Sequence, residues 1–162
     1  MADIHLHLLR HAHAGDASKW DRPDEERPLS ARGARQAERL ATLLVNAGFA
    51  TDAIVTSPKV RAEQTARILG EALRVDVRLD DRLASGFDLA GLAALLDDLG
   101  GPTDPVLVGH DPDFSDLIGE LVGVPLALRK GALARVDLAQ PVEAGDGTLR
   151  WLIPPDALAP RD

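Results

Sequence analysis

Cysteine and tyrosine are absent from this chain of 162 residues, and the other aromatic residues are scarce. The absence of cysteine excludes disulfides, thiolate catalysis and thiolate-ligated zinc or iron–sulfur centres. With two Trp and three Phe, the core must be built mainly from Leu, Val, Ile and Ala. No apolar run approaches the length of a membrane span, and histidines interrupt the N-terminal apolar run, unlike a signal peptide. We therefore expect a cytoplasmic protein without a membrane partner.

Basic residues are fewer than acidic ones. The chain has 18 Lys and Arg and 26 Asp and Glu, which gives a formal net charge of −8. A chain with this excess of negative charge repels nucleic acid, so no nucleic-acid partner is expected. The length fits one domain spanning residues 1–162, and the three prolines among residues 153–162 are typical of a tail. No pattern in the sequence predicts an oligomeric state.

Apolar residues recur along the chain with strand-like and helix-like spacing in turn. Strands are predicted at residues 4–9, 53–56, 75–79, 106–108, 132–138 and 148–153. Helices are predicted to about residue 47 after an N-cap at Ser30, from Pro58 after an N-cap at Ser57, and at residues 89–99 and 114–122. Strands that alternate with helices indicate an α/β protein. We expect a three-layer α/β/α sandwich around a mostly parallel sheet.

Two of the predicted strands end beside a histidine. Arg10 and His11 follow the first strand, and His110 follows the strand at residues 106–108. In open α/β sheets the carboxyl ends of the strands are where ligands bind, so the two imidazoles could meet in one crevice. Arg61 lies near the start of a predicted helix, where anions are already favoured. Two guanidinium groups and two imidazoles form a plausible clamp for one tetrahedral dianion.

Pairs of histidines two residues apart suggest an alternative, a metal-dependent hydrolase. His5 with His7, and His11 with His13, could each place two imidazoles on one face of a strand. Barrel enzymes that use such a motif need a much longer chain, and His110 is the only histidine left for a second ligand set. We therefore expect no metal.

Four segments together carry a family resemblance: 8–12 (Leu-Leu-Arg-His-Ala), 29–37, 57–66 and 106–112. In this order and spacing they resemble the histidine phosphatase superfamily, which includes phosphoglycerate mutases and acid phosphatases. The compact length looks most like the SixA-type phosphohistidine phosphatase branch. The resemblance implies a phosphoglycerate mutase-like fold, His11 as nucleophile, and phosphate-binding roles for Arg10, Arg61 and His110. One departure is Ala12, which stands where the family commonly has glycine and constrains φ there.

The resemblance also implies a reaction, in which neutral His11 attacks phosphorus and water hydrolyses the resulting phosphohistidine. Both arginines are expected to disfavour protonation of His11, and no metal or organic cofactor is required. The expected substrate is a phosphorylated protein, with phosphohistidine favoured, or a small phosphorylated molecule. Two alternatives remain open, a small-molecule phosphomonoester phosphatase or mutase of the same superfamily and a noncatalytic phosphate-binding module.

The polar segment at residues 14–28 is expected to be a surface excursion over the site, with Trp20 as its large apolar anchor. A phosphatase for alkyl phosphates would need a carboxylic acid to protonate the leaving oxygen. Several carboxylates lie nearby in the sequence, and no motif singles out one of them as that acid: Asp16, Glu63, Asp111 and Asp113.

Overall fold

The computed structural model describes residues 3–159, and within them the strands form one sheet in the order β3-β2-β4-β1-β5-β6. Their bounds are β1 (Ile4–Arg10), β2 (Ala53–Thr56), β3 (Val77–Leu79), β4 (Pro105–Gly109), β5 (Leu133–Leu138) and β6 (Thr148–Ile153). The neighbours β3, β2, β4 and β1 pair in parallel, whereas β5 is antiparallel to both β1 and β6. The mostly parallel sheet is therefore confirmed.

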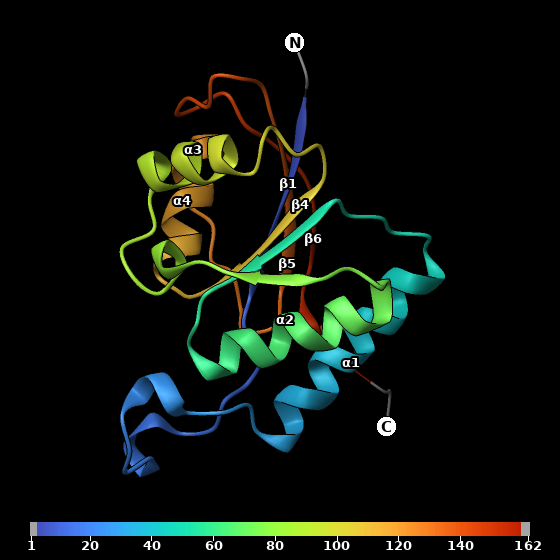
Figure 1. Ribbon diagram of the computed structural model, residues 1–162, viewed down its shortest axis with the longest axis vertical. Coiled ribbons are helices and arrows are strands. Elements are labelled where there is room, and N and C mark those ends of the chain that lie inside the picture. The colour runs from blue at the N-terminus through green and yellow to red at the C-terminus, as the bar shows by residue number, and fades with distance from the viewer. Residues whose placement is uncertain (1–2, 160–162) are drawn as a thin grey trace.

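Four longer helices of the described chain cover both faces of this sheet (Figure 1). They are α1 (Ala31–Asn46), α2 (Val60–Leu73), α3 (Leu89–Asp98) and α4 (Asp113–Val122). Leu9 packs with the apolar sides of α1 and α2, whereas Leu6 and Leu8 pack with those of α3 and α4. Successive side chains of a strand point to opposite faces, so β1 contributes side chains to the hydrophobic cores on both faces of the sheet. This arrangement is the predicted three-layer α/β/α sandwich.

The predicted start of α1 is confirmed, and that of α2 is wrong by two residues. Ser30 caps α1, because its side chain accepts a hydrogen bond from the Gly33 N–H. Ser57 does not cap α2, which begins at Val60 after Lys59. Instead, the Ser57 N–H donates to the Val108 carbonyl and prolongs the pairing of β2 with β4. The chain therefore turns into α2 later, which leaves the Ser57 hydroxyl at the end of the strands.

Two further boundaries differ from the predictions. The third strand starts at Val77 because the Val75 N–H donates to Gly70 and closes the end of α2, where Arg74 adopts a left-handed conformation. After β6, residues 155–158 form a 3₁₀ turn that buries Pro155 and packs Leu158 against the core beneath α1. The rest of the expected tail, residues 160–162, lies outside the described residues. Within residues 3–159, every helix is too short or too polar to span a bilayer.

Candidate active site

The carboxyl ends of β2, β4 and β1 lie side by side, and each is followed by a polar side chain. The His11 N–H donates to the Gly109 carbonyl at 3.0 Å, which extends the pairing of β1 with β4 by one residue. His11 and His110 thus leave adjacent strands, and their ring centroids are 5.2 Å apart. The predicted convergence of the two histidines is confirmed.

His11 is held as a neutral imidazole with one nitrogen available for chemistry. Its Nδ1 lies 2.7 Å from the Ala12 carbonyl oxygen, which can only accept, so Nδ1 carries the proton and Nε2 keeps its lone pair. The pKa of His11 is lowered to about 3, chiefly by burial and also by the neighbouring cations Arg61, Arg10 and Lys130, against the opposing effect of the hydrogen bond to Ala12. The expected effect of the two arginines is present, although burial is the larger cause.

His110 is paired with Ser57, for which the sequence predicts only a helix-capping role. The His110 Nε2 lies 2.7 Å from the Ser57 Oγ, which already accepts a hydrogen bond from the Lys59 N–H. Among residues 3–159 the Ser57 hydroxyl has no other acceptor for its proton, so we assign that proton to the bond with Nε2 and the ring proton of His110 to Nδ1. Burial, His11 and Arg61 lower the pKa of His110 to about 3, so this ring is also neutral. A neutral His110 presents one N–H donor at Nδ1.

Arg10 and Arg61 approach the histidines with unused donors. Arg10 donates from one terminal nitrogen to the Leu128 carbonyl at 2.9 Å, and Arg61 donates from both terminal nitrogens to Asp24 at 2.8 Å. The Nε atoms of both arginines are buried and have no partner among residues 3–159, as has Nδ1 of His110. Arg39 Nε, outside this cluster, also lacks a partner among these residues, but the three site residues lie together close to His11, where the charges of the two arginines favour an acceptor-rich anion.

Two further cations, Arg27 and Lys130, join this cluster and were missed in the sequence. Partial burial, together with Arg10, Arg27 and Arg61, lowers the pKa of Lys130. The segment that carries Lys130 is fixed by the Gly131 N–H, which donates to the Arg10 and His11 carbonyls. Arg27 donates to the Ala14 carbonyl at 2.8 Å. No local signal in the sequence distinguishes these two from the rest of the 18 Lys and Arg residues, because they lie in loops that are distant from each other in the sequence.

The excursion at residues 14–28 does reach the site, as expected. It lies beside the first turn of α2 in Figure 1, where a 3₁₀ turn at Asp24–Glu26 contacts the helix. Asp24 provides the contact, because its carbonyl and carboxylate both accept from Arg61. Although burial raises the pKa of Asp24, hydrogen bonds from Arg27 and Arg61 hold it below its usual range. An ionised carboxylate therefore sits against Arg61.

Trp20, the expected apolar anchor, is half-buried, and its indole N–H donates to the Pro23 carbonyl.

The main chain around Ala12 tolerates a methyl group. Arg74 is the non-glycine residue of the described chain with a positive φ, so Ala12 avoids the left-handed region. The Ala12 N–H donates to the Thr65 hydroxyl at 3.2 Å, and that hydroxyl donates to the Arg61 carbonyl at 2.8 Å. Thr65 therefore ties the residue after His11 to the turn of α2 that carries Arg61, a positioning role that the sequence did not reveal.

The remaining histidines have other partners. His5 Nδ1 lies 2.7 Å from the Asp104 carboxylate, His7 Nδ1 lies 3.2 Å from the Pro105 carbonyl, and His13 Nδ1 lies 2.7 Å from the Ser30 hydroxyl. Within residues 3–159, no group of three or more His, Asp or Glu side chains is arranged to hold a metal ion.

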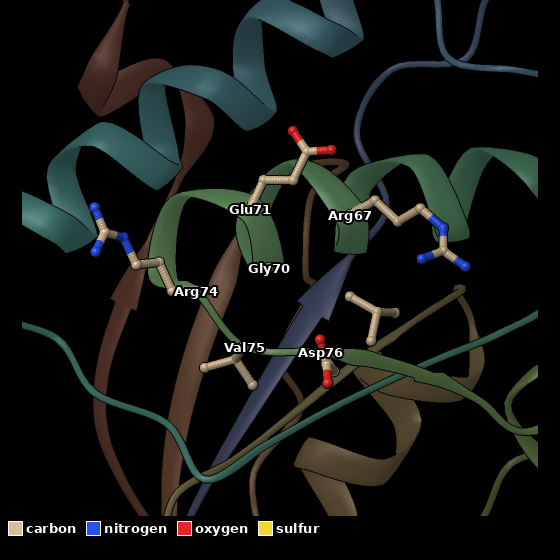
Figure 2. Close-up of a pocket in the computed structure, with 7 residues that line it drawn as sticks. Arg67, Gly70, Glu71, Arg74, Val75 and Asp76 are labelled. Carbon is tan, nitrogen blue, oxygen red and sulfur yellow. The ribbon is translucent and has the colours of Figure 1, made fainter.

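A polar hollow of about 410 Å³ lies at the opposite end of α2 (Figure 2). Its lining includes Gly70, Glu71 and Asp76, with Arg67 and Arg74 at its two ends. Arg67 is already paired with Glu63, and the site residue Arg61 lies six residues earlier, near the start of α2. This hollow is therefore separate from the histidine pair.

An α/β sandwich with buried histidines and clustered arginines at its strand ends is the arrangement expected of a phosphatase with the phosphoglycerate mutase-like fold. Comparison with known proteins agrees, because residues 6–85 match the histidine phosphatase superfamily (branch 1). An uncharacterised protein of Picosynechococcus is 34% identical over 116 residues, which is 70% of each chain. The chain belongs to the histidine phosphatase superfamily.

Similarity to SixA extends over nearly the whole chain. The phosphohistidine phosphatase SixA of Escherichia coli is 27% identical over 158 residues, which is 94% of both chains. The solved structure of the protein histidine phosphatase SixA complexed with tungstate superposes with a TM-score of 0.83 at 26% identity, and the match covers 96% of this chain and 100% of that one. The predicted superfamily and branch are thus confirmed.

Proposed function

We propose that this protein is a phosphohistidine phosphatase that uses His11 as nucleophile and forms a covalent phosphohistidine on Nε2. The observation that carries the proposal is the state of His11, a buried neutral imidazole with its proton on Nδ1. Such an imidazole can attack phosphorus without first losing a proton. The phosphoryl group then moves to Nε2 as the P–N bond of the substrate breaks.

The unsatisfied donors of Arg10, Arg61 and His110 support a phosphate-binding role for these residues. In phosphoryl transfer the negative charge is spread over three equatorial oxygens, and donors positioned beforehand stabilise it. Arg27 and Lys130 add positive charge at the same edge of the sheet. The similar protein SixA was solved in complex with tungstate, a tetrahedral oxyanion, and this supports oxyanion binding by this fold.

The substrate class follows from the carboxylates that contact the site. Asp24 is ionised and bound to Arg27 and Arg61, and Asp111 accepts two hydrogen bonds from Ser115. Ionised Asp24 cannot protonate an alkoxide leaving group, and both carboxylate oxygens of Asp111 are already engaged by Ser115. Phosphohistidine that carries a proton on its other ring nitrogen releases a neutral imidazole, which needs no proton from the enzyme. Water then attacks the phosphoenzyme, the P–Nε2 bond breaks, and inorganic phosphate leaves. A phosphorylated protein is therefore the favoured partner, ahead of sugar phosphates.

Two measurements test the proposal. Specificity constants for a phosphohistidine peptide and a panel of phosphosugars should favour the peptide, and a phosphosugar that reacts faster would refute the substrate class. Rapid quenching with labelled substrate should trap acid-labile, base-stable phosphate on the protein. The variant His11→Gln should carry no label, whereas His13→Gln, which alters a neighbouring histidine, should keep it. Label on serine or aspartate would refute the nucleophile.

A further inference from the structure

A second cavity lies on the face of the sheet that α1 and α2 cover. Its volume is about 540 Å³, within the range of small-molecule sites, and its lining includes His7, Leu43, Phe49, Trp151 and Arg135. His7 precedes His11 by four residues on β1, which separates the two by about 13 Å along the strand. The cavity is thus distinct from the proposed phosphate site.

The floor of this cavity carries an unused hydrogen-bond acceptor. His7 is 2% exposed, and its Nδ1 faces the Pro105 carbonyl, so Nδ1 holds the ring proton and Nε2 holds a lone pair. Among residues 3–159, Nε2 has no hydrogen-bond partner, yet it is not one of the fully enclosed polar atoms. Burial lowers the pKa of His7 to about 4, so the ring stays neutral at physiological pH. The acceptor is therefore reached from the cavity and lacks a donor.

Aromatic rings surround this acceptor. Phe49 packs edge-on against His7 with ring centroids 4.8 Å apart, and the Trp151 ring lies 5.6 Å away at an angle of 39°. Both side chains are partly buried against the core beneath α1. The chain has only two Trp and three Phe, so two of its five aromatic side chains meet at this cavity. Faces and edges of aromatic rings are the preferred partners of another aromatic ring.

The charged groups at the rim are already paired. Arg135 donates to the Asp137 carboxylate from Nε and one terminal nitrogen, and Asp104 is bound to His5. A charged ligand would therefore have to compete with existing ion pairs, whereas an uncharged one would not. The apolar walls, the aromatic rings and the single free acceptor all fit the same kind of molecule.

We propose that this cavity is a second ligand site, which binds an uncharged planar aromatic molecule that donates a ring N–H or O–H to Nε2 of His7. Indole is a suitable probe, and 1-methylindole is its matched control, because methylation removes the donor and keeps the ring. Since one net hydrogen bond contributes about 1 kcal/mol, we expect indole to bind several-fold to tenfold more tightly than 1-methylindole. Titration followed by ligand-observed NMR measures both dissociation constants.

Three variants locate the binding. His7→Phe keeps an aromatic ring and removes the acceptor, so it should weaken indole to the level of 1-methylindole. Ala47→Trp, at the exposed rim, should weaken both probes, whereas Ala72→Trp, an exposed alanine on α2 outside the cavity, should weaken neither. Phosphatase activity on an aryl phosphate reports whether each variant is folded, because none of these residues touches the proposed phosphate site.

Four results would overturn the proposal: absence of indole binding at millimolar concentration, equal affinity for the two probes, a preference for indole that persists in His7→Phe, or displacement of indole by inorganic phosphate. The last result would assign the binding to the histidine pair.

Discussion

Acid should destabilise this protein strongly, because three of its histidines are buried and neutral. Burial is the largest cause that lowers the pKa of His7 to about 4 and the pKa values of His11 and His110 to about 3. In the unfolded chain each imidazole has an ordinary pKa near 6.5. Below that pH the unfolded chain binds protons at these histidines, whereas the folded protein does not. The free energy of unfolding that is present above pH 6.5 therefore decreases as the pH falls.

The size of this loss follows from the interval of pH. Each pH unit below 6.5 costs about 1.4 kcal/mol per buried histidine until the folded-state pKa is reached. Between pH 8 and pH 5 each of the three histidines therefore contributes about 2 kcal/mol, and together they contribute about 6 kcal/mol. Domains of this kind are stable by about 5–15 kcal/mol, so the loss is a large fraction of the total.

Urea unfolding at pH 8, 7, 6 and 5 measures the effect, and His11→Gln isolates one histidine. Glutamine does not titrate and can still donate to the Ala12 carbonyl, which the His11 ring contacts in the wild type. The free energy of unfolding of this variant should fall by about 2 kcal/mol less than that of the wild type between pH 8 and pH 5. Equal pH dependence in the two proteins would mean that folded His11 accepts a proton above pH 5. His11 would then lack the free lone pair on Nε2 that nucleophilic attack requires.

Four further predictions concern the site and its support. Arg10→Ala and Arg61→Ala should each lower kcat/KM by about 30- to 1,000-fold, which corresponds to roughly 2–4 kcal/mol of transition-state stabilisation, and steady-state kinetics that show a smaller loss would exclude a direct role. Asp24→Asn should tighten inhibition by vanadate about two- to fivefold at pH 7, since it removes a negative charge from Arg61; weaker inhibition would mean that Asp24 orients Arg61 instead. Gly33→Ala should lower the free energy of unfolding by about 1–3 kcal/mol, because its Cβ would collide with the His13 carbonyl, and urea titration against Gly119→Ala, whose methyl group has more room, checks this. Turnover should persist after exhaustive chelation, and rescue of a chelated enzyme by zinc or manganese would favour metal chemistry.

The parts of the fold that follow local rules could be predicted from the sequence. Alternating apolar residues identified β1, and the Ser30 hydroxyl fixed the start of α1. The start of α2 could not be predicted in this way, because the competing partner of Ser57 is the Val108 carbonyl on a strand 51 residues away in the sequence. Local capping preferences cannot reveal that the chain stays extended at Ser57, because the strand that pairs with it is distant in the sequence.

The same distinction applies to the candidate site. His11, Arg10, Arg61 and His110 lie in ordered motifs and were found there, and the structure brings them together. Arg27 and Lys130 were missed because no motif marks them, and only the folding of two distant loops carries them to the site. Asp24 was missed for a further reason, since its ion pair with Arg61 joins an exposed turn to a buried helix start.

The contact between Asp24 and Arg61 joins two parts of the site that differ in their local stability against unfolding. The histidine end is held by sheet hydrogen bonds, among them the bond from the His11 N–H to Gly109. Such amides exchange with solvent chiefly when the whole domain unfolds. The excursion that carries Asp24 is largely exposed, and it can open without disturbing the sheet. Hydrogen exchange should therefore be slow at His11 and fast across residues 16–26. A bulky phosphorylated side chain could thus gain access by displacing this loop, while the nucleophile and its strand stay fixed.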